Sequence, residues 1–287
     1  MSREKRDFGF CIDSELTELV KKNVVSALIK AFATCYSLYE EGKVKYVSEF
    51  SRRASLALVK SFTCENAKHL IEQASKYLEA LYNEMSNIFS AVFAVNFTLT
   101  TRLSIYTRNP FMPLEIAISW DPVLNLPYIP SSSLKGAVRA WLELSGYTVI
   151  DGVSLSDVFG SSPKEEAKQV SLVVFSDAYP VGCVDKLIEP DVISPHYVGD
   201  SIAEVDVNPV PLVFPTLAPG TTMRFILALN YGLSKEKKVL DPKKAVKIAE
   251  LVLKALERGI GAKTNVGYGR VKSVIVKSIA KQQQPSN

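Results

Sequence analysis

The stretch Gly259-Ile-Gly-Ala-Lys-Thr-Asn-Val-Gly-Tyr-Gly-Arg270 lies between a helical pattern and a final apolar strand. Its four glycines permit positive φ angles and a close approach of the backbone to a ligand. The same stretch carries cationic, hydroxyl and amide side chains, namely Lys263, Thr264, Asn265 and Arg270. Such a glycine loop is typical of a phosphate site, although a plain turn closing the last strand fits the spacing equally well. Ala262 and Glu257 exclude a Walker A loop, which needs glycine there.

The elements around this loop predict the fold class. Asp241-Pro242 opens a helix that Gly259 ends, and a strand follows at 271–276. Further upstream, a β-branched and aromatic run predicts a strand over 91–106, and an apolar run predicts a buried strand over 170–175. A turn over 215–220 leads into a third strand over 222–230. With a helix beginning near Leu134, the order is strand, helix, strand, strand, helix, strand. This order predicts an α+β, ferredoxin-like or RRM-like antiparallel sheet with helices on one face.

The stretch 128–143 is the second candidate site, because serines precede an amphipathic helical pattern. Ser131, Ser132 and Ser133 can cap the helix, and its N–H groups then suit a phosphate. Lys135 and Arg139 share the polar face at four-residue spacing. A capped amphipathic helix with two solvated cations fits the residues equally well.

The remaining chain predicts three further parts. Residues 1–88 form a helical section packed on the core, with one helix over 14–41, capped by Ser14 and stopped by Gly42, and another over 67–85. Residues 89–278 form the ferredoxin-like domain, with proline-rich insertions at 107–127 and 178–220, the latter a long loop or hairpin. Residues 279–287 are expected to be a disordered tail.

Composition narrows the class of protein. The 287 residues are 47% hydrophobic and 22% charged, as in soluble globular proteins, and no apolar run is long enough for a membrane span. No signal core follows the charged N-terminus, so the expected location is the cytoplasm. The four cysteines include no C-x-x-C pair, so we expect neither a zinc site nor disulfides. The net charge of the chain is +4, and the segment 235–247 alone has the same net charge, because its six lysines outnumber its two carboxylates by four. A lysine-rich run of this kind most often forms a solvated surface.

Three stretches together resemble the CRISPR-associated RAMP superfamily. Tyr128-Ile-Pro-Ser-Ser-Ser-Leu-Lys-Gly-Ala-Val-Arg139 is similar to its P-G-S-S-x-K-G-x-x-R motif, with Ser131 in place of glycine. Residues 259–270 resemble its C-terminal glycine-rich loop. Asp191-Val-Ile-Ser-Pro-His-Tyr197 is similar to the D-x-x-T-P-H-Y segment of one branch, the sixth subunit of the type III-B (Cmr) effector complex, with Ser194 in place of threonine. The resemblance covers about residues 90–278.

The resemblance implies a non-catalytic, guide-RNA-binding subunit of an antiviral ribonucleoprotein, without a cofactor or metal. Its implied partners are the CRISPR guide RNA near the 3′ end, target RNA indirectly, and other RAMP subunits of the Cmr complex, especially the repeated backbone subunit. The residues implied to touch the guide are Ser132, Ser133, Lys135, Arg139, Gly261, Lys263, Thr264, Asn265, Tyr268 and Arg270. Asp191, His196 and Tyr197 would anchor a loop or meet a partner.

Two other functions remain open from the residues alone. His196, with the carboxylates of Asp191, Asp200, Glu204 and Asp206 near it in sequence, would suit a metal- or His-dependent endoribonuclease. The proline-rich segment 178–220 would suit an assembly adaptor whose RNA contacts are incidental.

Overall fold

The computed structural model describes residues 8–38, 46–105, 108–161, 170–194, 211–231 and 241–281. Contacts between residues divide the chain into two units. We call Met1–His69, Ser104–Pro127 and Val184–Ala218 the helical unit, and Leu70–Leu103, Tyr128–Cys183 and Pro219–Asn287 the sheet unit. In the described ranges no helix combines the length and the hydropathy of a membrane span.

The sheet unit is built on five antiparallel strands. β11 (Val271–Ala280), β1 (Ala91–Leu99), β10 (Thr222–Leu229) and β6 (Val173–Phe175) are hydrogen-bonded in that order, and β7 (Tyr179–Gly182) also pairs with β10. Numbered along the chain without β7, the order is 4-1-3-2, so the predicted ferredoxin-like arrangement is confirmed.

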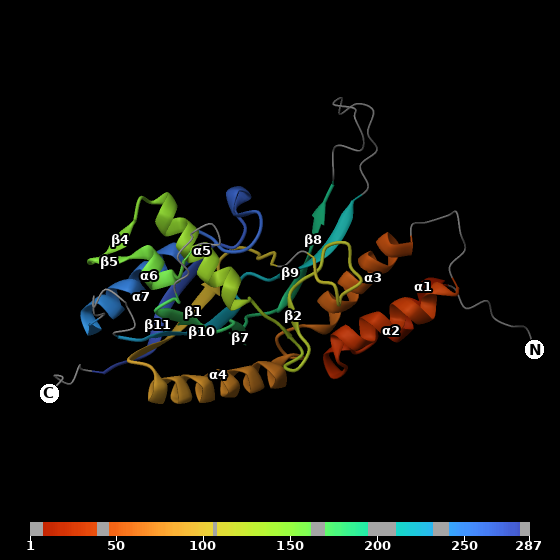
Figure 1. The fold of residues 1–287 in the computed structure, drawn as a ribbon. Helices are drawn as coiled ribbons and strands as arrows, with labels where there is room; N and C mark the ends of the chain where they lie inside the picture. The colour runs from red at the N-terminus through yellow and green to blue at the C-terminus, as the bar shows by residue number, and fades with distance from the viewer. Residues whose placement is uncertain are drawn as a thin grey trace, which may run out of the picture. The chain divides into compact units, whose positions relative to one another are not determined.

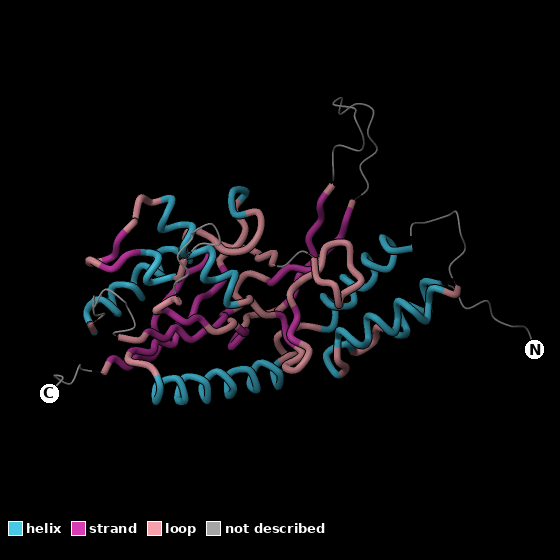
Figure 2. Tube along the Cα trace, in the orientation of Figure 1, coloured by secondary structure: helices cyan, strands magenta, loops and turns pink. Residues whose placement is uncertain are grey.

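Helices cover both faces of this sheet. α7 (Pro242–Glu257) packs on β11 and β1, and α5 (Ser131–Leu144) packs on α7 and β6. On the other face lies α4 (Lys68–Ile88), where the rings of Tyr77 and Tyr179 are 5.8 Å apart (Figure 1, Figure 2). The side chains of the central strand β1 are therefore nearly all buried. A hairpin of β4 (Val149–Ile150) and β5 (Val153–Ser154) and the short helix α6 (Leu155–Phe159) complete the unit.

The helical unit joins segments that are far apart in the sequence. It contains α1 (Phe8–Glu15), the 3-10 turn η1 (Leu19–Lys21), α2 (Val24–Tyr36) and α3 (Tyr46–Ser61). Two hairpins, β2 (Trp120–Asp121) with β3 (Leu126–Pro127) and β8 (Ile188–Ile193) with β9 (Leu212–Leu217), add to them. α3 packs on β8 and β9. The carboxamide of Asn125 accepts from the Val24 N–H (2.9 Å) and the Trp120 indole N–H (3.2 Å), and donates to the Lys22 carbonyl (2.7 Å).

Several local predictions were wrong. The expected helix over 14–41 is broken, because Glu18 takes a left-handed conformation (φ 53°) and Asn23 caps a new helix by accepting from the Ser26 N–H. α3 was not predicted. The first strand ends at Leu99 rather than 106, and β11 continues to Ala280, into the expected tail. A Cys11–Cys35 disulfide joins α1 to α2, contrary to expectation.

The division into units also differs from the predicted boundary at residue 88. From Leu70 onward α4 groups with the sheet, and insertion 107–127 groups with the N-terminal helices. The predicted helix over 67–85 and the Asp241 cap are confirmed: Asp241 Oδ1 accepts from the Lys244 N–H at 2.9 Å. Much of the lysine-rich run 235–247 lies outside the described residues.

Candidate nucleic-acid interface

In the N-terminal turn of α5, backbone N–H groups that could bind a phosphate already donate to acceptors of the protein itself. The helix begins at Ser131, three residues before the expected start, with Pro130 as its cap. The Ser131 N–H donates to Asp177 Oδ1 at 2.6 Å, and the N–H groups of Ser133 and Leu134 donate to the Pro130 carbonyl. A phosphate at this helix end would therefore meet the carboxylate of Asp177, which works against binding there.

Lys135 and Arg139 lie on one face of α5, as predicted, but in different surroundings. Arg139 donates to the Glu143 carboxylate and to the Gly160 carbonyl, both at 2.7 Å. Lys135 Nζ has a weaker contact, 3.5 Å from the Val173 carbonyl oxygen. Burial lowers the pKa of Lys135 below its ordinary value of 10.5, and the charge of Arg139 lowers this pKa further. An anion beside Lys135 would offset both effects.

The glycine loop follows α7 and takes left-handed backbone at five positions. Gly259, Gly261, Lys263, Gly267 and Gly269 all have positive φ. Gly269 also permits a close approach of two backbone segments, because a Cβ there would overlap with the Ile260 carbonyl oxygen. Its N–H donates to the Arg102 carbonyl at 2.9 Å, and its carbonyl accepts from the Ile260 N–H at 3.1 Å. The loop is thereby fastened to the segment that follows β1.

Arg270 holds this loop closed. Its guanidinium donates to the carbonyl oxygens of Arg258 and of Thr264, the latter at 3.3 Å. The backbone N–H of Arg270 donates to Thr101 Oγ1 at 3.0 Å. Two of the five guanidinium N–H donors are thus directed to carbonyl oxygens of the loop and of its preceding helix end, so Arg270 shapes the loop from inside. The backbone N–H groups of Val266, Gly267 and Tyr268 also bond within the loop.

The exposed surface of the glycine loop is formed by Gly261, Lys263, Asn265 and Val266. Lys263 Nζ lies 5.2 Å from the centroid of the Tyr268 ring, a cation–π contact that positions the ammonium group. Because α5 packs against α7, which leads into the loop, both candidate segments belong to the side of the sheet unit that α5 and α7 cover (Figure 1). Lys135 and Lys263 are the two cations there that best suit a phosphate.

A model of the RAMP superfamily matches residues 106–272, which include the α5 turn and the glycine loop. The chain belongs to the RAMP superfamily. This RAMP protein is 30% identical over 239 residues to the CRISPR system Cmr subunit Cmr6 of Saccharolobus solfataricus, covering 80% of this chain and 75% of the relative. To Cmr6 of Pyrococcus furiosus it is 31% identical over 159 residues, covering 51% and 42%.

One solved structure is similar over most of this RAMP protein. It is a chain in the cryo-EM structure of the type III-B Cmr-beta complex bound to cognate target RNA. The TM-score is 0.70 at 25% identity, with 94% of this chain and 98% of that chain covered.

The third predicted group of this RAMP protein lies in the helical unit. Asp191 is buried on β8, and its Oδ1 accepts from the Val192 N–H at 2.8 Å. His196 and Tyr197, like Asp200, Glu204 and Asp206, fall outside the described residues. Within the described ranges, no group of three or more His, Cys, Asp or Glu side chains is arranged to hold a metal ion.

The sequence did not reveal the role of Asp177 or of Thr101. Asp177 follows β6 and caps α5 from a position 46 residues away in the chain. Neither residue belongs to a motif that would have pointed to it.

Proposed function

We propose that this RAMP protein is a non-catalytic, guide-RNA-binding subunit of a type III-B CRISPR effector. The observation that carries the proposal is its similarity along nearly the whole chain to a component of a Cmr-beta complex, with a TM-score of 0.70. The Saccharolobus relative, a Cmr6 subunit, supports the same assignment.

In this proposal Lys135 and Lys263 contact guide phosphates near the 3′ end, aided by the hydroxyls of Ser132, Ser133 and Thr264. Arg139 and Arg270 act mainly as positioning residues, because both guanidinium groups already donate to carbonyl oxygens of the protein. Contacts of this kind hold RNA without reading its bases. That property suits a protein whose guide sequence changes from one complex to the next.

The proposed protein partners are neighbouring RAMP subunits, above all the repeated backbone subunit, and target RNA is met only through the guide. Asp191 and the hairpin of β8 and β9 belong to the segment that would meet a neighbour. A subunit of this kind needs only modest RNA affinity of its own.

The test is binding of an oligouridine to the full chain across a range of salt concentrations. Each single-strand phosphate contact contributes about 0.7 to the slope of log affinity against log salt, so Lys135→Ala/Lys263→Ala should reduce the slope by about 1.4. The matched control is Lys68→Ala/Lys76→Ala, which removes two exposed lysines from α4. An equal loss in both double variants would contradict the assigned contacts.

A parallel reaction with added Mg²⁺ or Mn²⁺ tests the non-catalytic assignment. We expect intact RNA. Cleavage that is lost in Asp191→Asn or His196→Gln would overturn the proposal in favour of an endoribonuclease.

A further inference from the structure

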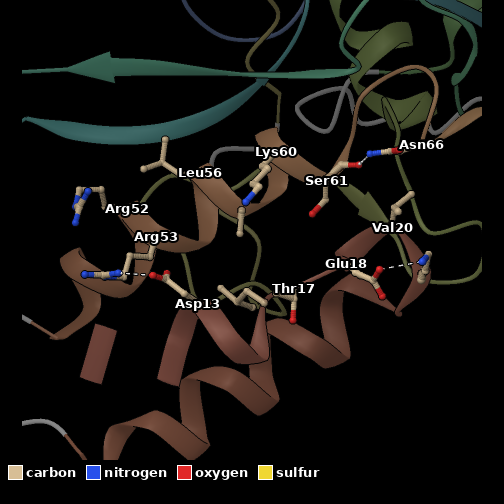
Figure 3. A pocket seen from close by; sticks show the side chains of 13 residues that line it. Asp13, Thr17, Glu18, Val20, Arg52, Arg53, Leu56, Lys60, Ser61 and Asn66 are labelled. Atoms are coloured by element: carbon tan, nitrogen blue, oxygen red, sulfur yellow. Dashed lines mark hydrogen bonds and ion pairs between the residues drawn. The ribbon is translucent and has the colours of Figure 1, made fainter. Parts of the chain in front are cut away.

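A pocket of about 690 Å³ in the helical unit lies outside every motif discussed so far. Its volume is in the usual range for ligand-binding pockets. One wall is a face of α3, where Arg52, Leu56 and Lys60 recur at four-residue spacing (Figure 3). The other wall comes from α1 and η1, because the left-handed turn at Glu18 lets both elements line the same space.

The floor of this pocket is apolar. Leu16 and Val20 are only 2% and 8% exposed, so they form a packed base. Leu56 stands at the pocket wall and is 41% exposed, which leaves a large apolar side chain in contact with water. An apolar group of a ligand that covers Leu56 would gain the free energy of removing this surface from water.

The charges around the floor are unevenly compensated. Arg53 pairs with Asp13 at 2.8 Å, and Lys21 pairs with Glu18 at 2.9 Å. Arg52 pairs with Glu49 at 2.7 Å. Lys60 extends from the last turn of α3 into the pocket (Figure 3), and no carboxylate among the described residues lies within ion-pair distance of its Nζ. The pocket therefore presents an uncompensated cation next to an exposed leucine.

The lining favours a peptide over RNA as the occupant. None of the described residues that line the pocket is aromatic, whereas single-stranded RNA is commonly held by stacking its bases on aromatic rings. From Arg52 to Lys60, α3 advances by about 12 Å, at 1.5 Å per residue. This length matches about four residues of an extended peptide, at about 3.3 Å each.

We propose that this pocket docks a short acidic segment of a partner protein. An apolar side chain of the segment packs on Leu16, Val20 and Leu56, and an adjacent aspartate or glutamate pairs with Lys60. The site is independent of the RNA contacts proposed for the sheet unit, and it gives the helical unit a role in recognising a neighbour.

The test is selection of a displayed random heptapeptide library on the immobilised full chain, repeated with variants. Lys60→Glu and Leu56→Ser alter the pocket. Lys76→Glu reverses an exposed lysine on α4, and Val47→Ser removes an apolar side chain that is 47% exposed on α3 outside the pocket lining. Thermal melts establish that each variant is folded.

We expect the wild type and both controls to enrich peptides that pair Asp or Glu with a large aliphatic residue. Affinity for an enriched peptide should fall about tenfold in Lys60→Glu, since an attraction becomes a repulsion. Enrichment of no such pattern, or equal affinity in the pocket variants, would overturn the proposal. So would a loss of oligouridine binding in Lys60→Glu without any peptide enrichment, which would mark the pocket as an RNA site.

Discussion

Asp177 Oδ1 accepts a 2.6 Å hydrogen bond from the backbone N–H of Ser131, so a carboxylate occupies the helix end that the sequence offers as a candidate phosphate site. The same carboxylate stabilises α5 by capping it and by opposing the positive end of the helix dipole. Helix stability and anion binding therefore make opposite demands on residue 177.

The substitution Asp177→Asn tests whether the carboxylate stabilises α5 and at the same time weakens RNA binding. The amide oxygen can still accept from Ser131, but the negative charge is gone, so RNA affinity should rise while stability falls by about 0.5 kcal/mol. Oligouridine binding and chemical denaturation measure the two effects. Asp121→Asn is the matched control, because Asp121 also accepts backbone N–H bonds, from Val123 and Leu124. Unchanged RNA affinity in Asp177→Asn would place the phosphates away from this turn.

Lys135→Met removes a half-buried charge and keeps most of the side-chain volume. Because its folded pKa lies below 10.5, the unfolded chain binds more protons between the folded pKa and 10.5. Wild-type stability should therefore contain a contribution that rises with pH in this window, and the variant should lack it. Denaturation at several pH values up to 10.5 compares the two proteins.

The RNA affinity of Lys135→Met should fall even though its stability is equal to or above that of the wild type. Lys76→Met, which removes an exposed lysine from α4, controls for the loss of one positive charge. A variant that binds RNA normally would show that Lys135 does not contact phosphate.

Gly269→Ala should be the most destabilising alanine substitution in the glycine loop. The new Cβ would overlap with the Ile260 carbonyl oxygen, and φ is +65°. We expect a loss of about 3 kcal/mol or more, against about 1–2 kcal/mol for Gly267→Ala, where no atom lies within 4 Å of the Cβ and only the backbone is strained. Gly136→Ala, inside α5, should stabilise by up to about 1 kcal/mol. Chemical denaturation ranks the three variants, and similar losses at 267 and 269 would contradict the close backbone contact.

Removal of the Cys11–Cys35 disulfide should loosen α1 and α2 selectively. The bond closes a chain separation of 24 residues, for which loop-closure entropy predicts about 3.5 kcal/mol. Amide hydrogen exchange of Cys11→Ala/Cys35→Ala should be faster in these helices and nearly unchanged in β1 and β10. Equal acceleration throughout the chain would contradict a local effect.

The sequence predicted the sheet far better than the helical unit. β10 and α7 carry strong local signals: an apolar run after a proline- and glycine-containing turn predicts β10, and the Asp241-Pro242 start predicts α7. Periodicity instead predicted one helix through η1 and α2, because apolar spacing from Leu16 to Cys35 continues across the turn at Glu18, and it did not predict α1. α3 was missed since Phe50, Ala54 and Leu58 are separated by serines, arginines and other polar residues, which weakens the pattern.

The candidate site was predicted only in part for a similar reason. Spacing placed Lys135 and Arg139 on one face of a helix, but periodicity does not report that the Gly160 carbonyl accepts from Arg139. Likewise, a glycine-rich stretch indicates an unusual backbone, but not that Arg270 fastens it. Contacts with residues distant in sequence decide which cation remains available to a ligand.

The three hydrogen bonds of the Asn125 side chain have a consequence for biosynthesis. Two of them, with Lys22 and Val24, join the start of α2 to a segment made about a hundred residues later, and β9 is completed later still. At a ribosomal rate of about 5–20 residues per second, the segment around Asn125 and the strand β9 are synthesised on the order of 10 s after the N-terminal helices that they pack against. During that interval the nascent chain exposes the apolar faces of α2 and α3, which makes it a natural client for chaperones.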